Sequence, residues 1–301
     1  ADNPVGVAFI DEAHLLLTQG KQSYRGKNQL QDIIERARVT VVMFDEYQIL
    51  TTEQFWEAQI LEKYRKQAEA TNNHIILDKQ LRMQAGPETM DWIDSFTKRN
   101  EIKKLPETVD GYTIKVFDDP EQLDLEITEK AKKTDSALSR LIATYDWEYS
   151  SKAKRRFRKY WEVEIGAWHK PWNRELKSEL SQKEKRQIKD LAWAEQPQTI
   201  NEVGSTFTIQ GFDLNYAGVI LGPSVKYRNG KVIYDPEKSC NDKAIQNRTL
   251  SDGSKQKFGE ILIQHAVRVL MTRGVNGMFI YACDDELREA LKRATQRGET
   301  K

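Results

Sequence analysis

The stretch Val7-Ala8-Phe9-Ile10-Asp11-Glu12-Ala13-His14 decides how the amino-terminal part of the chain is interpreted. Its continuously apolar run is typical of a strand buried in a parallel sheet. Two adjacent carboxylates follow, as in a Walker B motif. In that motif Asp11 would hold Mg²⁺, and Glu12 would orient or deprotonate the attacking water. The stretch therefore predicts a strand whose carboxyl end carries phosphate chemistry.

A phosphate-binding G-x-x-x-x-G-K-[ST] loop does not precede these acids, because only ten residues stand before Asp11. Gly20 and Gly26-Lys27 resemble such a loop only loosely. Five residues separate these glycines instead of four, and Asn28 stands where Ser or Thr is needed. We interpret the segment as a polar loop. The chain thus carries the acids of an ATP site without its phosphate cradle.

The composition excludes several classes of protein. The chain has 301 residues, enough for two domains, and its net charge is only +1, so a nucleic-acid surface must be a local patch. Two distant cysteines and four scattered histidines do not suggest a zinc site. We find no signal peptide and no apolar run of 18 residues. These features predict a cytoplasmic protein that does not use a membrane.

Two further strands are predicted, at Val39–Phe44, which ends in Asp45-Glu46, and at His74–Leu77. Helices are expected over residues 27–38 and 52–70, which gives a parallel sheet covered by helices. Ligands of such sheets bind at the carboxyl ends of the strands. We therefore expect side chains that follow these strands to share one site: Asp11, Asp45 and Arg82.

The remainder of the chain again alternates strands and helices, so the predicted fold is α/β with two domains. Residues 1–100 form the first predicted domain and residues 101–301 the second, with a basic and aromatic insertion near 145–195. In the second domain a hairpin should turn at Asn229-Gly230.

Gln48 follows the second strand, where a glutamine can hydrogen-bond a γ-phosphate or the attacking water. The simpler alternative is a polar turn that opens a helix. Arg82, in Gln80-Leu81-Arg82-Met83, could clamp phosphate oxygens, although a surface ion pair is the commoner fate of an arginine.

Two motifs of the second half carry further candidates. In Gln210-Gly211-Phe212-Asp213 the glycine permits a close backbone approach, and Asp213 could hold a ribose hydroxyl or simply cap a helix. Arg273 ends a predicted helix and could act as an arginine finger on the γ-phosphate. Its simpler role would be to offset the negative end of the helix.

Basic residues alternate with aromatic ones between residues 152 and 172, which is the pattern of a surface that binds single-stranded nucleic acid. The alternative is a solvated amphipathic segment whose tryptophans pack into the core, and we prefer it for the tryptophans. The predicted nucleic-acid contacts are Lys154, Arg155, Arg158 and Lys159.

Taken in order, these motifs resemble superfamily 1 helicases, and most closely the DUF2075 family, the Schlafen group 3-like DNA/RNA helicase domain. The quoted matches run from Phe9–Leu16 through Val42–Gln48, Leu77–Met83, Lys170–Asn173 and Ile209–Asp213 to Leu270–Gly274 and Tyr281–Asp284. They span nearly the whole chain.

The resemblance implies two RecA-like P-loop domains with ATP in the cleft between them. It also implies that single-stranded DNA or RNA crosses the top of both domains. It implies that Asp11 holds Mg²⁺, Glu12 is the catalytic base and Gln48 couples hydrolysis to domain movement. Arg82 and Arg273 would contact the γ-phosphate. Gln210, Gly211 and Asp213 would line the nucleotide and nucleic-acid side of the second domain.

The family's P-loop lies before the Walker B strand, so we expect this chain to be a C-terminal fragment of an ATP-dependent helicase or translocase. Such a fragment should bind ATP weakly, hydrolyse it negligibly and expose apolar surface that a homodimer could cover. Two other functions remain open. One is a non-catalytic nucleic-acid-binding module, and the less favoured one is a metal-dependent nuclease using Asp11, Glu12, Asp45 and Glu46.

Overall fold

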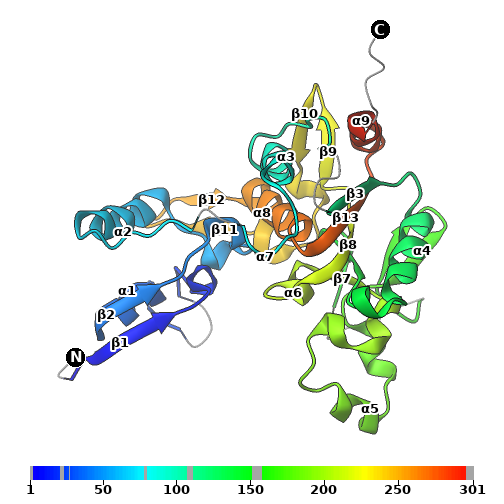
Figure 1. The fold of residues 1–301 in the computed structure, drawn as a ribbon. Helices are drawn as coiled ribbons and strands as arrows, with labels where there is room; N and C mark the ends of the chain where they lie inside the picture. Colours follow the sequence, from blue (N-terminus) through cyan, green and yellow to red (C-terminus); the bar gives the residue numbers. More distant parts are fainter. Residues whose placement is uncertain are drawn as a thin grey trace. The chain divides into compact units, whose positions relative to one another are not determined.

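The chain is divided into two units by its internal contacts (Figure 1). The computed structural model describes residues 3–20, 24–26, 28–77, 80–106, 111–150 and 158–295. The first unit comprises residues 1–80 and 242–265, and the second comprises 81–241 and 266–301. The division near residue 80 comes earlier than the sequence predicted, and a segment of the second half belongs with the first unit.

The first unit is built on two parallel strands, β1 (Val5–Ile10) and β2 (Ala37–Val42), joined through α1 (Gln29–Ile34). The Asn28 side chain caps α1 by accepting a hydrogen bond from the Gln31 amide at 3.1 Å. The helix is shorter than predicted because β2 already begins at Ala37. Both strands that were predicted for this region are present, and their parallel pairing is confirmed.

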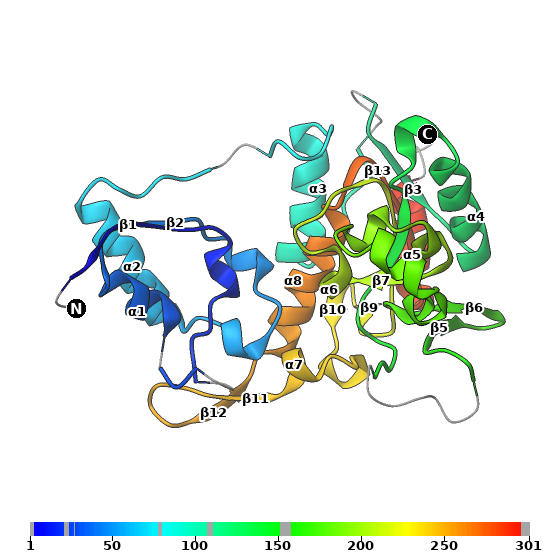
Figure 2. The same cartoon turned by 90° about the horizontal axis from the view of Figure 1, so that it is seen from below.

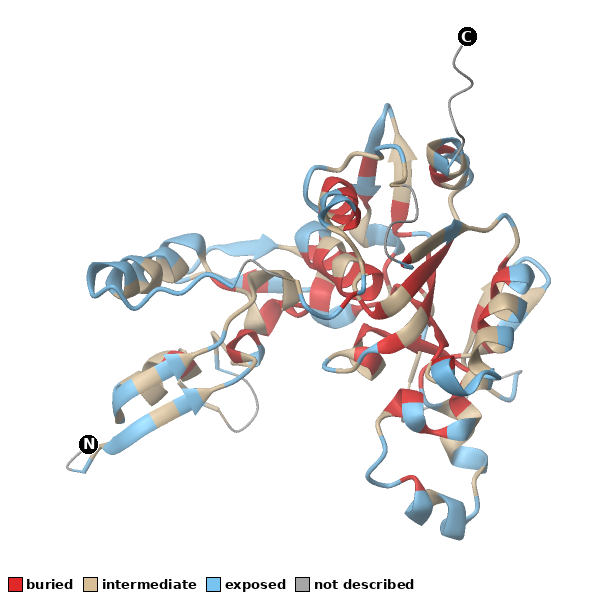
Figure 3. Cartoon of the chain, in the orientation of Figure 1, coloured by how far each residue is buried: buried red, intermediate tan, exposed pale blue. Residues whose placement is uncertain are grey.

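One face of this small sheet covers the core of the first unit. Ile10 and Val42 contact a buried cluster that includes Leu30, Ile49 and Trp56. The opposite face is exposed (Figure 3), with exposed fractions of 48% at Val7, 75% at Phe9, 54% at Val39 and 37% at Val41. Parallel strands are usually buried on both faces, so this bare apolar face is unusual.

The third predicted strand, at His74–Leu77, is wrong. These residues follow α2 (Ala58–Ala70) in a segment without regular secondary structure. Ile75, Ile76 and Leu77 are 80%, 73% and 87% exposed. An apolar run becomes a strand only where a neighbouring strand offers hydrogen bonds and a surface to cover. In the part of the chain that the structure describes, residues 74–77 have no such partner.

A later segment completes the first unit. It contains α7 (Asp242–Ile245) and the antiparallel ribbon of β11 (Asn247–Thr249) and β12 (Lys255–Lys257). The chain then enters α8 (Gly259–Met271), whose first half belongs to this unit. His265 on that half contacts the Ile49 carbonyl oxygen at 3.0 Å.

The second unit is built around a five-stranded sheet in the order β3-β13-β8-β4-β7, in which every neighbouring pair is parallel. This sheet confirms the predicted mixed α/β class. Its strands are β3 (Thr113–Val116), β4 (Arg140–Ala143), β7 (Val203–Ser205), β8 (Leu214–Leu221) and β13 (Gly274–Ala282).

Helix α4 (Pro120–Ala131) packs on this sheet through Leu123 and Ile127, both of which are fully buried. Gly218 on β8 permits the close approach, because a Cβ atom there would lie 2.7 Å from Ile127 and from Leu141. The buried strands appear as the red centre of this unit in Figure 3. The sheet and α4 therefore share a buried core in the second unit.

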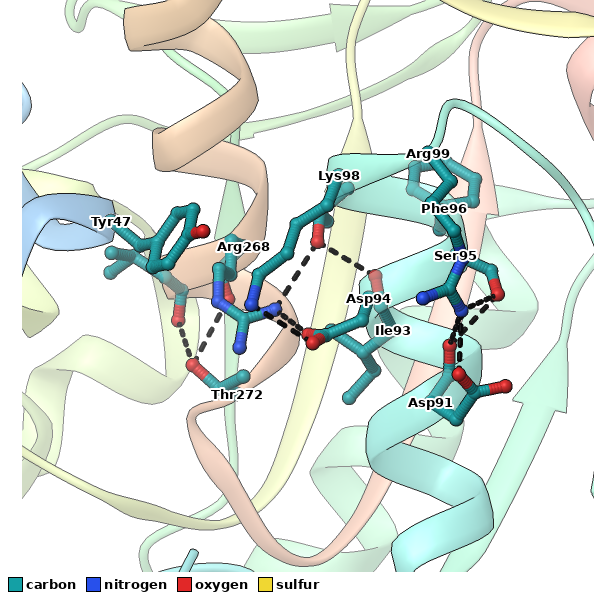
Figure 4. Close-up of polar contacts among 12 residues, drawn as sticks. Tyr47, Asp91, Ile93, Asp94, Ser95, Phe96, Lys98, Arg99, Arg268 and Thr272 are labelled. Carbon is teal, nitrogen blue, oxygen red and sulfur yellow. Dashed lines mark hydrogen bonds and ion pairs between the residues drawn. The ribbon is translucent and has the colours of Figure 1, made fainter. Parts of the chain in front are cut away.

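Helix α3 (Pro87–Lys98) is fixed to the second half of α8 by charge (Figure 4). The Asp94 carboxylate pairs with Arg268 of α8 and with Lys98, whose Nζ is 2.9 Å away. On the same helix Asp91 pairs with Arg99 at 2.6 Å. These pairs hold the start of the second unit in place.

Smaller elements complete the second unit. The predicted turn at Asn229-Gly230 is confirmed, with φ angles of 51° and 79° between β9 (Val225–Arg228) and β10 (Lys231–Tyr234). A second hairpin joins β5 (Glu162–Ile165) to β6 (Trp168–Pro171), and α9 (Asp285–Thr295) follows β13. Within the described ranges, no helix is long and apolar enough to cross a bilayer.

Candidate nucleotide and nucleic-acid site

The acidic pair lies at the carboxyl end of β1, where it was predicted. The Ala13 amide donates to the Met43 carbonyl oxygen at 2.8 Å, which ties the end of β1 to the end of β2. Asp11 is exposed, and its Oδ1 accepts a hydrogen bond from the Glu12 amide at 2.9 Å. Its Oδ2 has no partner among the described residues. An exposed carboxylate oxygen of this kind suits Mg²⁺, which prefers oxygen ligands.

Glu12 has an unusual conformation. Its backbone is left-handed, with φ 51° and ψ 41°, which costs a non-glycine residue roughly 1–3 kcal/mol. Its Oε2 lies 2.8 Å from His14 Nε2, and the His14 side chain is only 2% exposed. The 3-10 turn Ala13–Leu15 places this histidine beneath the acid. Glu12 is thus held by a buried partner, and such local strain is common at functional sites.

The acids after β2 are engaged differently. Asp45 caps the turn Glu46–Gln48, because its Oδ1 accepts from the Tyr47 amide at 3.0 Å and its Oδ2 from Gln48 Nε2 at 3.0 Å. Glu46 pairs with Arg65 at 2.9 Å. Asp11 and Asp45 therefore follow neighbouring strands, as predicted. In this structure the Gln48 side-chain amide donates its hydrogen bond to Asp45. Among the described residues, no group of three or more potential ligands is arranged to hold a metal.

A second cluster lies at the amino ends of β8 and β13. Asp213 stands just before β8, and Arg273 just before β13, where the Leu214 amide donates to the Arg273 carbonyl oxygen at 2.8 Å. Arg82 Nε lies 2.5 Å from Asp213 Oδ1, and an Arg273 NH group lies 3.8 Å from the same oxygen. Predicted residues separated by as many as 191 positions, from Arg82 to Arg273, thus meet around one carboxylate. Arg82 reaches it from the approach to α3 and does not follow a strand, contrary to the prediction.

Arg273 is deeply buried. Its side chain is 1% exposed, and its guanidinium donates to the carbonyl oxygens of Val269 at 3.2 Å and Phe212 at 3.5 Å. Arg82 is more accessible, at 37% exposed. In the described conformation Arg273 therefore supports the segment around Asp213 and does not present its charge to solvent.

Gln210 and Gly211 precede Phe212 and Asp213 in the chain. Gly211 adopts φ 78°, a left-handed conformation that glycine occupies most easily, and no atom would block a Cβ there. The Gln210 Nε2 atom is buried without a hydrogen-bond partner in the described part of the chain. A buried donor left unpaired costs about 1–3 kcal/mol, so a ligand oxygen at this position would relieve that cost.

The predicted nucleic-acid contacts are only partly described, since Lys154 and Arg155 lie outside the described residues. Arg158 lies 3.3 Å from Glu162 and 3.1 Å from Glu164, and Lys159 lies 2.7 Å from Glu179. These acids offset both positive charges. Trp172 is fully buried, and Trp161 and Trp168 pack against the same core, as the alternative reading of the tryptophans predicted.

Asp146 is a buried acid that was not predicted from the sequence. Asp146 follows β4, and its Oδ2 accepts hydrogen bonds from Thr144 Oγ1 at 2.8 Å and the Ser224 amide at 3.0 Å. Burial raises the pKa of this carboxyl to about 6, although the bonds from Ser224 and Thr144 act in the opposite direction. The signal in the sequence was an acid just beyond the apolar run of β4, the same pattern that identified Asp11.

Comparisons with known proteins cover all of these residues. Residues 1–284 match the family described as Schlafen group 3, DNA/RNA helicase domain. The uncharacterised protein YPL245W of Saccharomyces cerevisiae is 30% identical to the chain over 315 residues. That alignment covers 97% of the chain but 65% of the relative, so the chain spans less than two thirds of that protein's length.

Proposed function

Because the chain belongs to the Schlafen group 3 DNA/RNA helicase domain family, we propose that it forms part of a nucleic-acid-dependent ATPase of the helicase or translocase type. The observation that carries this proposal is the meeting of Arg82 and Arg273 around Asp213. The same loop also holds the unpaired Gln210 amide. A purely structural domain has no evident use for two arginines and a glutamine donor near the amino ends of β8 and β13. A nucleotide, with its phosphates and ribose, has a use for each.

In this proposal the first unit supplies the acids of hydrolysis. Asp11 holds Mg²⁺, which when bound neutralises phosphate charge. Glu12 orients the attacking water and accepts its proton, and Gln48 couples the phosphate state to movement. For Glu12 to act, its carboxylate must leave His14, 2.8 Å away. For Gln48 to act, its amide must leave Asp45, 3.0 Å away.

The second unit supplies the cations and the nucleotide contacts. Arg82 and Arg273 stabilise negative charge on the γ-phosphate, while Asp213 keeps their guanidinium groups together when no phosphate is present. Gln210 donates to a ligand oxygen, and Gly211 lets the backbone come close. We further propose that both units are RecA-like, with single-stranded DNA or RNA as the activating ligand.

A second candidate is a nucleic-acid-binding module without turnover. It is favoured by the burial of Arg273 and by the engagement of Glu12 with His14, since both groups are occupied within the chain. A metal-dependent nuclease is the weakest candidate, because Asp45 serves as a turn cap and Glu46 pairs with Arg65.

The substitution Glu12→Gln tests the proposal. In the full-length protein that contains this chain, it should lower kcat for ATP hydrolysis by at least about 100-fold, because a general base contributes roughly 10²–10⁴. The Kd for ATP should change little, since Glu12 acts on water. Steady-state hydrolysis and equilibrium binding of a fluorescent ATP analogue would measure the two effects.

Glu46→Gln provides the matched control. It removes an acid from the neighbouring strand end, where Arg65 is the partner, and should leave kcat within about 3-fold of wild type. Equal losses in the two variants would mean that the acids act through folding. A wild-type protein that binds nucleic acid but hydrolyses no ATP would favour the non-catalytic module.

A further inference from the structure

The β11–β12 ribbon of the first unit, drawn in yellow-orange in Figure 2, has no role in the nucleotide chemistry above. Its two strands pair antiparallel, with Asn247 opposite Lys257, Arg248 opposite Gln256 and Thr249 opposite Lys255. Gly253, with φ 85°, sits in the connecting turn, where Asp252 accepts a hydrogen bond from the Ser254 amide at 2.8 Å.

The ribbon is firmly anchored through one face. Arg248 is 2% exposed and donates to the Thr52 carbonyl oxygen at 2.8 Å. Glu57 accepts hydrogen bonds from the Ser251 amide at 3.0 Å and from its hydroxyl at 2.6 Å. Gln246, just before the ribbon, donates to Glu53 at 2.7 Å. A two-stranded ribbon is marginal by itself, so these contacts fix its orientation on the first unit.

The other face carries polar and positive side chains only. Alternate residues of a strand point to opposite faces, so Asn247, Thr249, Lys255 and Lys257 share the face opposite Arg248. All four are exposed. Neither lysine forms an ion pair within the described ranges, whereas Arg65 in the same unit lies 2.9 Å from Glu46. The face therefore presents two uncompensated charges beside two hydrogen-bonding side chains.

We propose that this face of the ribbon binds the phosphate backbone of single-stranded DNA or RNA. The inference rests on the proposed function and names a nucleic-acid contact for it. Lysine, threonine and asparagine side chains are among the usual donors to phosphate oxygens. Neighbouring positions on one face of a strand lie about 7 Å apart, which is close to the spacing of successive phosphates in an extended strand.

Other anionic partners fit this face less well. A membrane surface is bound through apolar side chains combined with charge, and this face has no apolar residue. An acidic peptide would be attracted by the lysines, but threonine and asparagine add little for carboxylates alone. A simpler explanation of Lys255 and Lys257 is that lysines on an exposed strand prevent edge-to-edge pairing with another strand. Binding measurements separate these cases.

The test is the binding of a fluorescent 20-nucleotide single strand, as DNA and as RNA, to the 301-residue chain. The double substitution Lys255→Glu with Lys257→Glu should weaken binding at least 10-fold. It should also reduce the slope of log K against log salt by roughly 1–2, since each lost phosphate contact on a single strand accounts for about 0.7. The matched control is Lys63→Glu with Lys66→Glu on α2, two exposed lysines of the same unit, which should change Kd by less than about 3-fold.

The same set of variants also tests whether the substitutions disturb folding and whether another polyanion binds as well as nucleic acid. The milder pair Lys255→Gln with Lys257→Gln should give an intermediate loss, and melting temperatures should match wild type. The proposal is overturned if the ribbon variant binds like wild type, if the α2 variant loses as much affinity, or if polyglutamate binds as tightly as the oligonucleotide. If the ribbon variant binds like wild type, ATP hydrolysis that nucleic acid stimulates would still support the proposed function. If wild type binds no nucleic acid, the ribbon proposal fails, and nucleic-acid stimulation of ATP hydrolysis then decides the proposed function separately.

Discussion

At the scale of single residues, Asp213 is the centre of the candidate site in the second unit. One carboxylate lies 2.5 Å from Arg82 and 3.8 Å from Arg273. Two guanidinium groups that close would repel one another without the intervening negative charge. The carboxylate therefore allows both cations to lie together near the amino ends of β8 and β13.

This arrangement predicts the effect of Arg273→Ala. If Arg273 acts on the γ-phosphate, the substitution should lower kcat of the full-length protein by at least about 1,000-fold, which is the lower end of the contribution of an arginine finger. Arg273→Lys should restore little, because lysine lacks the planar fork of donors. Steady-state ATP hydrolysis measures both variants.

Arg99→Ala is the control for this prediction. Arg99 is 41% exposed, and its ion-pair partner is Asp91, at 2.6 Å, not Asp213. Its loss should leave kcat unchanged within about 2-fold. Because Arg273 is also buried, a drop in melting temperature that accounts for the whole loss of activity would assign it a structural role.

The sequence supplied candidate site residues, but it did not indicate the contacts among them. Arg82, Gln210, Asp213 and Arg273 were each recognised from short motifs. The motifs did not indicate that Asp213 joins the two arginines, because that contact depends on where β8 and β13 begin in the sheet. The motifs also did not reveal that Arg273 is buried.

At the scale of elements, continuous apolar runs identified β1 and β2 correctly and His74–Leu77 incorrectly. The runs look alike in sequence, since each is short and rich in β-branched residues. What distinguishes them is a partner: β1 and β2 pair with each other and cover Leu30 and Trp56, whereas Ile75 to Leu77 cover nothing. A strand forms only when it pairs with another strand, so a single apolar run in the sequence is not enough to predict one.

The carboxyl ends of β4 and β8 form a second connected element. Thr144 Oγ1 accepts from the Gly222 amide at 2.8 Å and donates to Asp146, which in turn accepts from the Ser224 amide. A Cβ at Gly222 would lie 2.4 Å from the Asp146 carboxylate, so glycine is required there. The buried acid therefore fastens the loop after β8 to the end of β4.

This loop gives a pH prediction. Burial raises the pKa of Asp146 from its ordinary 3.8 to about 6 in the folded chain. The stabilisation from its protonated form is therefore complete below about pH 4 and is lost as the pH rises through 6. Asp146→Asn removes this dependence. The free energy of unfolding of the variant relative to wild type should rise by on the order of 2–3 kcal/mol between pH 4 and pH 7.5.

Urea denaturation of both proteins at several pH values measures this difference. Glu202, whose pKa burial raises to about 7, also titrates in this range, but it is present in both proteins and cancels in the comparison. Parallel stability curves for wild type and variant would show that Asp146 has an ordinary pKa.

At the scale of the whole molecule, the polypeptide crosses between its two units near residues 80, 241 and 265. The last crossing falls inside α8, so a single helix carries His265 in one unit and Arg268 in the other. The sequence predicted two α/β domains but not this interleaving. The predicted boundary rested on the charged connector that ends near Pro106, and no comparable connector marks the segment 242–265.

We propose that this chain is part of an ATPase that responds to nucleic acid. The most direct measurement is the rate of ATP hydrolysis by the full-length protein with saturating single-stranded DNA or RNA, divided by the rate without it, compared between wild type and Asp11→Asn. We expect stimulation of at least about 10-fold in wild type and no measurable turnover in the variant, since Asp11 is the proposed Mg²⁺ ligand. Equal rates with and without nucleic acid, or turnover that survives Asp11→Asn, would contradict it.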